Sequence, residues 1–188
     1  MWPSLLWSFS VIGVAKGMVY LMNGLAVYPG TFDPITLGHL NVIKRAARIF
    51  ERVIVLVSVN SDKKPAFTVE ERVSQVKRVC ARFPNVEVDF SEKLVAEYCR
   101  DKGAKILIRG LRALSDFDKE CQMANFNRKL NPDLDTFFLV ADSKYTYLSS
   151  TAVKEMARYG ADLSEYVPRE IIQEIIDKIG NGGKSYAK

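Results

Sequence analysis

The sequence predicts an α/β fold in which helices pack on both faces of a five-stranded parallel sheet. Apolar runs of strand length alternate with amphipathic helical runs along most of the 188 residues. The run at 52–59, RVIVLVSV, is rich in β-branched residues, which is typical of a parallel strand buried on both faces. The chain has no internal repeat, low-complexity block or interdomain linker. Strands that alternate with helices require right-handed crossovers, so we expect a single Rossmann-like doubly wound domain.

The stretch 25–45, LAVYPGTFDPITLGHLNVIKR, contains the unit around which this domain is organised. Residues 25–28 form an apolar run of strand type, and Pro29-Gly30 breaks it. An amphipathic run then begins after His39 and continues to Phe50. The unit is a strand, a glycine-containing turn and a helix. In open α/β sheets, ligands bind at such a junction, beyond the carboxyl end of the strand.

The remaining elements follow in the same alternation. Thr68 is predicted to cap a helix, because Glu71 three residues later completes a capping box. Gly103 is a stop signal for the helix before it, and the Ser149-Ser150-Thr151 run is a helix cap. The further predicted strands are 52–59, 86–88, 105–108 and 136–140, and the further predicted helices are 68–83, 92–102, 116–130, 149–157 and 168–179.

The two ends of the chain differ from the rest. Residues 1–23 are apolar, but Lys16 interrupts them too early for a membrane-spanning helix. A secretory signal has basic residues before its apolar run, and this segment has none there. We expect an extension produced by a misassigned start codon or an expression vector. The alternative is a segment that associates with a membrane or a partner. The domain is expected over 24–180, followed by a disordered tail at 181–188.

Net charge and cysteine content indicate which ligands and which cellular compartment to expect. The net charge is +5 and the pI is about 9.1, which suits anionic ligands such as nucleotides and phosphates, and equally RNA. Cys80, Cys99 and Cys121 are widely spaced, and the chain has one histidine, so no zinc site is expected. Unpaired cysteines fit a reducing compartment, which predicts a cytoplasmic protein.

The one histidine, His39, falls in the first turn of the helix that follows Gly30. Glycine lets a ligand approach the backbone, and a helix N-terminus offers free N–H groups and partial positive charge. Thr31 and Thr36 add hydroxyl donors. A lone histidine is more often structural, but this position favours a phosphate-binding site.

Basic or hydroxyl groups also follow the other strands. Lys63, with Lys64 as the alternative, follows the second strand, and Arg109 and Arg112 follow the fourth. Ser149-Ser150-Thr151 follows the fifth. Each loop alone is consistent with a solvated surface or an ordinary helix cap. Because the carboxyl ends of parallel strands share one edge, all four loops are expected to meet there.

Three segments carry a family resemblance. YPGTFDPITLGH at 28–39 resembles the signature of the TxGH nucleotidyltransferases, with Thr36-Leu37-Gly38-His39 as the TxGH motif. ILIRGLRALSDFDKE at 106–120 and DSKYTYLSSTAVKE at 142–155 resemble the phosphopantetheine adenylyltransferase family within them. The resemblance covers about 25–179. This chain has Lys119 and Tyr145 where the family often has an aromatic residue and a tryptophan, respectively.

The resemblance implies adenylyl transfer from ATP to 4′-phosphopantetheine, giving dephospho-coenzyme A and pyrophosphate. Mg²⁺ would accompany ATP, the chain would assemble as a homohexamer, and coenzyme A is an expected feedback inhibitor. Neither a nucleic acid nor a membrane is expected as a partner, and no residue is expected to bind a metal directly.

The resemblance also assigns residues. His39 would stabilise charge on the α-phosphate, and Thr31 and Lys63 would orient the nucleophile. Substrate-binding residues would be Thr31, Lys63, Val95 and Arg109. ATP-binding residues would be Thr31, Phe32, His39, Gly110, Leu111, Arg112, Glu120, Tyr145, Thr146, Tyr147, Leu148, Ser149, Ser150 and Thr151.

Two alternatives stay open. A sister enzyme of the same fold would transfer adenylate or cytidylate to another phosphate, such as nicotinamide mononucleotide or glycerol phosphate. A basic RNA-binding module would explain the charge, but not a lone histidine after a glycine turn, and the aromatic residues do not form a stacking platform.

Overall fold

The computed structural model describes residues 22–59, 64–112 and 114–180. Three predictions lie outside the described residues. They concern residues 1–21, the tail at 181–188 and the role of Lys63. The strands are β1 (Met22–Gly30), β2 (Phe50–Ser58), β3 (Val86–Ser91), β4 (Ile106–Leu111) and β5 (Asp135–Val140). The α-helices are α1 (Leu37–Ile49), α2 (Val69–Cys80), α3 (Val95–Asp101), α4 (Leu114–Leu130), α5 (Ser150–Arg158) and α6 (Ile172–Ile179), with short 3-10 helices η1 (Ser143–Tyr145) and η2 (Arg169–Ile171).

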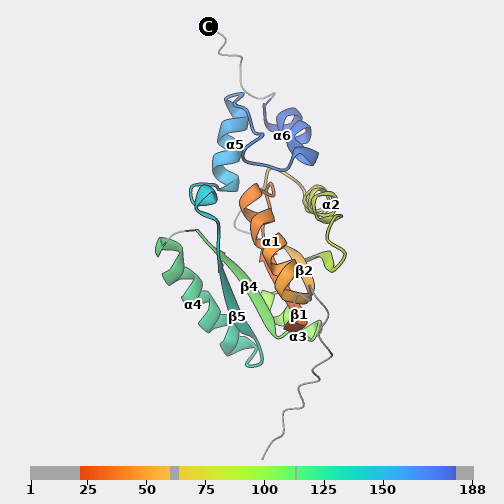
Figure 1. Ribbon diagram of the computed structural model, residues 1–188, viewed down its shortest axis with the longest axis vertical. Helices are drawn as coiled ribbons and strands as arrows, with labels where there is room; N and C mark the ends of the chain where they lie inside the picture. The colour runs from red at the N-terminus through yellow and green to blue at the C-terminus, as the bar shows by residue number, and fades with distance from the viewer. Residues whose placement is uncertain (1–21, 60–63, 113, 181–188) are drawn as a thin grey trace, which may run out of the picture.

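The five strands form one parallel sheet in the order β3-β2-β1-β4-β5. β1 is therefore central, with β2 and β3 on one side and β4 and β5 on the other (Figure 1). The direction of winding reverses between β3 and β4. The switch point, where ligands bind in such sheets, lies between the carboxyl ends of β1 and β4.

Alternation along the strands builds two hydrophobic cores, one on each face of the sheet. Val53, Val55 and Val57 pack with the buried residues of α1, α2, α5 and α6. Ile54 and Leu56 belong to the second core, which includes the buried face of α3 and Leu130 of α4. This arrangement confirms the predicted α/β domain with helices on both faces (Figure 1).

Most predicted elements are present, and most differences are at their ends. The helix predicted over 168–179 is instead the 3-10 helix η2 followed by α6. Thr68 and Glu71 form the predicted capping box, and Ser149 caps α5. α2 ends at Cys80 rather than near Phe83. α3 begins at Val95 rather than at Glu92, because β3 extends to Ser91, whose hydroxyl accepts a hydrogen bond from the Lys93 N–H at 3.0 Å and holds a turn. Across the described ranges, no helix combines the length and apolar character needed to cross a bilayer.

Candidate active site

His39 is held at the start of α1 by a capping box in which it takes the position usual for glutamate. The Thr36 hydroxyl accepts from the His39 N–H at 3.3 Å, and the Thr36 N–H donates to His39 Nδ1 at 3.1 Å. Nδ1 is therefore an acceptor, and in the neutral ring the proton resides on Nε2. Nε2–H is left as a donor at the N-terminal end of the helix.

Phe32 supports the imidazole from the side. It adopts a left-handed φ of 48°, and its ring meets the His39 ring edge-on with centroids 5.1 Å apart. Gly30 makes room for it, since a Cβ at Gly30 would lie 2.7 Å from the Phe32 ring. Phe32 is only 1% exposed, so its side chain is part of the core and any contact with ATP would involve its main chain.

The surroundings of His39 favour its neutral form. Burial, and then the positive charges of Arg112 and Arg109, lower the pKa of His39 to about 4. At neutral pH the ring is therefore uncharged, and it acts as a hydrogen-bond donor through Nε2 rather than as a cation.

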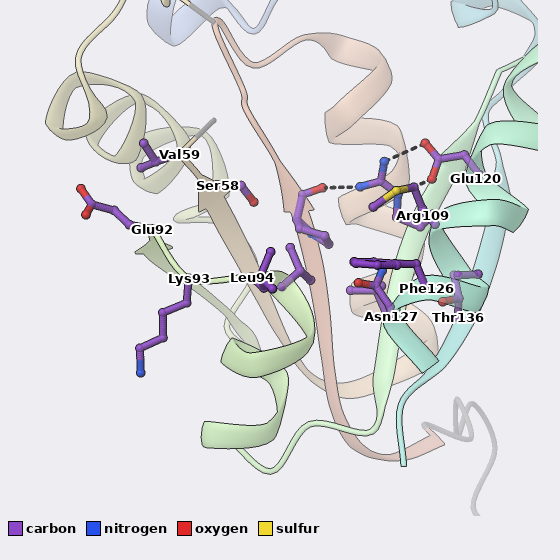
Figure 2. A pocket seen from close by; sticks show the side chains of 15 residues that line it. Ser58, Val59, Glu92, Lys93, Leu94, Arg109, Glu120, Phe126, Asn127 and Thr136 are labelled. Atoms are coloured by element: carbon purple, nitrogen blue, oxygen red, sulfur yellow. Dashed lines mark hydrogen bonds and ion pairs between the residues drawn. The ribbon is translucent and has the colours of Figure 1, made fainter. Parts of the chain in front are cut away.

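Arg109 lies within β4 rather than after it as predicted, because the strand continues to Leu111 in register with β5. Its Nε and Nη2 donate to the two Glu120 carboxylate oxygens at 2.6 and 2.7 Å, and its Nη1 donates to the Pro29 carbonyl at 3.3 Å (Figure 2). A guanidinium carries five N–H donors, so one on Nη1 and one on Nη2 remain for a ligand. The fixed fork suits phosphate oxygens.

Beside Arg109 is a pocket of about 370 Å³ between β1, β2, α3 and α4 (Figure 2). Its lining includes Leu94, the N-cap residue of α3, and Val95, the first residue of that helix. The substrate contact predicted at Val95 stays a prediction. α4 contributes a face with helical spacing that the sequence analysis overlooked. The α4 lining residues are Glu120, Met123, Ala124, Phe126 and Asn127. Spacings of three, four and seven residues from Glu120 are the signal that could have found most of them.

On the α1 side of the switch point, the loops that were predicted to bind the nucleotide lie in contact with one another. Arg112 donates to the Leu148 carbonyl at 3.1 Å, and the Ser150 hydroxyl donates to the Pro34 carbonyl at 2.8 Å. A Cβ at Gly38 would lie 3.6 Å from the Tyr145 Cβ, so the loop after β5 rests on the glycine of TxGH. The loops after β1, β4 and β5 therefore converge beside His39.

The other residues predicted to bind ATP differ in how accessible they are. Leu111 and Leu148 are buried, and Thr31 and Tyr145 are half-buried. Tyr147 is 69% exposed, and Thr146 and Thr151 are also exposed. Glu120 lies in the pocket as the partner of Arg109, so its predicted contact with ATP stays a prediction.

Asp33 connects three segments of the site and was not singled out by the sequence. Its carboxylate accepts from the Ala66 N–H at 3.0 Å, the Phe67 N–H at 2.9 Å and Lys154 Nζ at 2.7 Å. Burial alone would raise the pKa of Asp33, but the hydrogen bonds from Lys154, Ala66 and Phe67 outweigh it and hold that pKa below its usual value. Asp33 thus ties the β1–α1 loop to the β2–α2 loop and to α5.

Arg72 makes a second connection between the same loops. This buried side chain donates through Nη1 to the Thr31 carbonyl at 2.7 Å and through Nε to the Phe67 carbonyl at 3.2 Å. The main chain of Thr31, directly after β1, is therefore also held by a side chain of α2. The arginine in EERV carries no sequence signal that distinguishes it from a surface residue of α2.

Cationic and N–H donors dominate at this edge of the sheet. Among the residues with described positions, no group of three or more histidine, cysteine or acidic side chains could hold a metal ion. Arg109, Arg112 and the start of α1 are suited instead to the oxygens of phosphate groups.

Comparisons with known proteins agree with this chemistry. Residues 27–156 match the cytidylyltransferase-like family model. The chain is 49% identical to the phosphopantetheine adenylyltransferases of Alkaliphilus metalliredigens and Desulforudis audaxviator, over 82% and 85% of this chain and 98% of each relative. It is 47% identical to that of Clostridium novyi, over 83% of this chain and 97% of the relative. A Vibrio parahaemolyticus structure assigned as a nicotinate-nucleotide adenylyltransferase shares the fold, with a TM-score of 0.62 and 17% identity over 84% of this chain and 96% of that one.

Proposed function

This chain belongs to the phosphopantetheine adenylyltransferase family, and we propose that it transfers the adenylyl group of ATP to 4′-phosphopantetheine in coenzyme A biosynthesis. The products are dephospho-coenzyme A and pyrophosphate. The observation that carries this function is the adjacency of two sites at the switch point. An apolar pocket ends at the Arg109 guanidinium, and His39 lies among the loops predicted to bind the nucleotide.

The reaction requires positioning more than proton transfer. An oxygen of the 4′-phosphate attacks the α-phosphorus of ATP, and the bond from that phosphorus to the oxygen bridging to the β-phosphorus breaks. Pyrophosphate leaves with the electron pair of that bond. Because the attacking oxygen belongs to a phosphate anion, no side chain has to deprotonate it. Alignment of the two phosphates and neutralisation of their charge supply the catalysis.

His39 is the group that we assign to the charge developing on the α-phosphate. Its acceptor Nδ1 is fixed by Thr36, so Nε2–H is oriented before any ligand binds. A donor that needs no reorganisation contributes more to catalysis than one that must be ordered during the reaction. Arg112 and the Ser149–Thr151 loop lie next to it and are assigned to the polyphosphate.

Arg109 is assigned to the 4′-phosphate of the acceptor, with the arm of the acceptor extending into the pocket lined by Leu94 and Val95. The two remaining guanidinium N–H donors match two phosphate oxygens. Thr31 and Lys63, or Lys64 in its place, complete the set of groups assigned to orienting the nucleophile. Lys64 is exposed in the β2–α2 loop, two residues before Ala66, whose N–H donates to Asp33.

Mg²⁺ is proposed to enter with ATP, as the magnesium complex of the substrate. The donors at the site favour phosphate oxygens over a resident metal, and Mg²⁺ commonly keeps several waters and binds through substrate phosphates. Chelation by EDTA is expected to abolish turnover, and added Mg²⁺ is expected to restore it.

The test of function is pyrophosphate release from ATP and Mg²⁺, measured with and without 4′-phosphopantetheine. Release that depends on the acceptor, with dephospho-coenzyme A as the second product, is the expected result. Nicotinamide mononucleotide and nicotinate mononucleotide with ATP, and glycerol phosphate with CTP, are the comparison substrates. Turnover with one of these and none with 4′-phosphopantetheine would contradict the proposal.

We also propose a cytoplasmic homohexamer that coenzyme A inhibits. All three cysteines are free, which supports a reducing compartment. α4 and β5 lie together at one side of the molecule (Figure 1). Both carry exposed apolar side chains, which assembly would cover. Coenzyme A contains the same arm as the acceptor, so it is expected to compete with 4′-phosphopantetheine in steady-state kinetics.

A further inference from the structure

The Ser58 hydroxyl is buried and has no hydrogen-bond partner within the described part of the chain. Ser58 is the last residue of β2, and it lines the pocket beside Arg109 (Figure 2). Buried polar atoms are almost always paired in folded proteins, because an unpaired one has lost its bonds to water without replacement. An orphan hydroxyl at a ligand pocket therefore indicates a partner that the ligand brings.

The strand fixes the direction of this side chain. Ile54 and Leu56 of β2 belong to the core on the α3 and α4 face, and Ser58 follows them at the same spacing of two. The hydroxyl therefore lies on the pocket side of the sheet. Pro29, on the neighbouring strand, has no N–H that could donate to the Ser58 hydroxyl.

We propose that Ser58 is a specificity-determining residue whose hydroxyl hydrogen-bonds a polar group in the arm of the acceptor substrate. This inference rests on the proposed function. The pantetheine arm alternates methyl and methylene groups with one hydroxyl and two amides. The lining also includes the apolar side chains of Leu94, Val95 and Met123, which suit the hydrocarbon part. Ser58 supplies a polar contact at the end of β2, on the same pocket wall as Pro29.

The test uses Ser58→Ala in the full chain, with steady-state kinetics for both substrates. KM for 4′-phosphopantetheine is expected to rise by about 3- to 10-fold, the usual effect of one uncharged hydrogen bond. kcat and KM for ATP are expected to stay within about twofold of wild type. Inhibition by pantetheine, which lacks the phosphate, should weaken by a similar factor, because the bond is to the arm.

Melting temperatures separate a ligand contact from a structural role. Without ligand, Ser58→Ala should melt at or above the wild-type temperature, since the substitution removes an unpaired buried hydroxyl. The increase in melting temperature caused by 4′-phosphopantetheine should be smaller than in wild type. Ser74→Ala, which removes an exposed serine hydroxyl on α2, is the matched control and should change neither value.

The outcomes distinguish this inference from the function on which it rests. If wild type turns over 4′-phosphopantetheine and Ser58→Ala has the same KM, the proposed contact is wrong and the function stands. A loss of affinity confined to the phosphorylated acceptor would also overturn the contact with the arm. If wild type neither turns over nor is stabilised by 4′-phosphopantetheine, the function and this inference both fail.

Discussion

His39 shows how one residue can serve structure and chemistry with its two ring nitrogens. Nδ1 completes the cap of α1 by accepting from Thr36, and this same bond leaves Nε2–H as the donor. Phe32 fixes the plane of the ring through an edge-on contact. The catalytic donor is thus ordered by local structure that forms with the helix itself.

His39→Ala is expected to lower kcat by about 10²- to 10³-fold, the usual effect of removing one preorganised donor at a developing charge. KM for ATP should change much less, because Arg112 and the α5 cap are intact. The measurement is steady-state pyrophosphate release, with circular dichroism to confirm the fold. Near-wild-type kcat in a folded variant would rule out the catalytic role.

Stability should depend on the protonation of His39 in a defined pH window. Its pKa is about 4 in the folded protein, below the usual 6.5, so the unfolded chain binds more protons between these values. The free energy of unfolding should be highest above pH 6.5 and fall as pH decreases toward 4. Urea unfolding at pH 7 and pH 5 should show a larger loss in wild type than in His39→Asn. Equal losses in the two proteins would mean that His39 is not the group responsible.

Arg109 illustrates a site in which a lysine cannot replace arginine. Arg109→Lys should raise KM for 4′-phosphopantetheine by about tenfold or more, because one ammonium cannot hold Glu120 and Pro29 and still present two donors. Arg128→Lys, at an exposed ion pair with Asp135, is the matched control and should leave KM unchanged. An unchanged KM in Arg109→Lys would contradict the assignment to the 4′-phosphate.

At the scale of elements, the site is assembled by connections between loops. Asp33 and Arg72 join the β1–α1 loop to the β2–α2 loop, and Lys154 joins both to α5. None of these side chains was assigned to a substrate. Their contacts set where Thr31 and the α5 cap lie relative to His39.

Asp33→Ala is expected to reduce the free energy of unfolding by about 3 kcal/mol or more, because it leaves the Lys154 ammonium and two buried N–H groups without their partner. The pKa of Asp33 is lowered, so its stabilising contribution is present above the ordinary aspartate range and is lost as pH falls through the folded pKa. Denaturant unfolding at pH 7 and pH 3 measures both effects.

Asp101→Ala is the control for Asp33→Ala. It breaks an exposed ion pair with Lys93 and should change the unfolding free energy by less than about 1 kcal/mol. Comparable losses in the two variants would show that the Asp33 connection contributes no more than a surface ion pair.

At the scale of the whole molecule, the side formed by α4 and β5 is incompletely covered. Phe117 of α4 is 44% exposed, and Val140 at the end of β5 is 61% exposed. An edge strand with exposed apolar residues favours association with another chain. Light scattering after gel filtration is expected to give a mass about six times the 21.2 kDa of one chain. A monomer at all concentrations would contradict the proposed hexamer.

Local sequence patterns were sufficient to predict much of the fold and the convergence of the loops after β1, β4 and β5. Periodicity located the strands and helices, and the Thr68–Glu71 capping box is present as predicted. The ends of elements differ from prediction: α3 starts three residues late because the Ser91 turn competes with the helix. The spacing from Glu120 groups most pocket residues of α4 on one face, but which element that face packs against depends on the tertiary structure.

The sequence by itself determined the parallel α/β architecture and the loops that carry hydrogen-bond donors for phosphate. Both follow from hydrogen bonding and periodicity over a few residues. Only the tertiary structure decided the strand order and the burial of the Ser58 hydroxyl. It also decided the two ion pairs, Arg109 with Glu120 and Asp33 with Lys154. These features depend on which segments pack together, and Asp33 and Lys154 are 121 residues apart. The lowered pKa of His39 belongs with them, because desolvation and neighbouring charge exist only after the chain has packed.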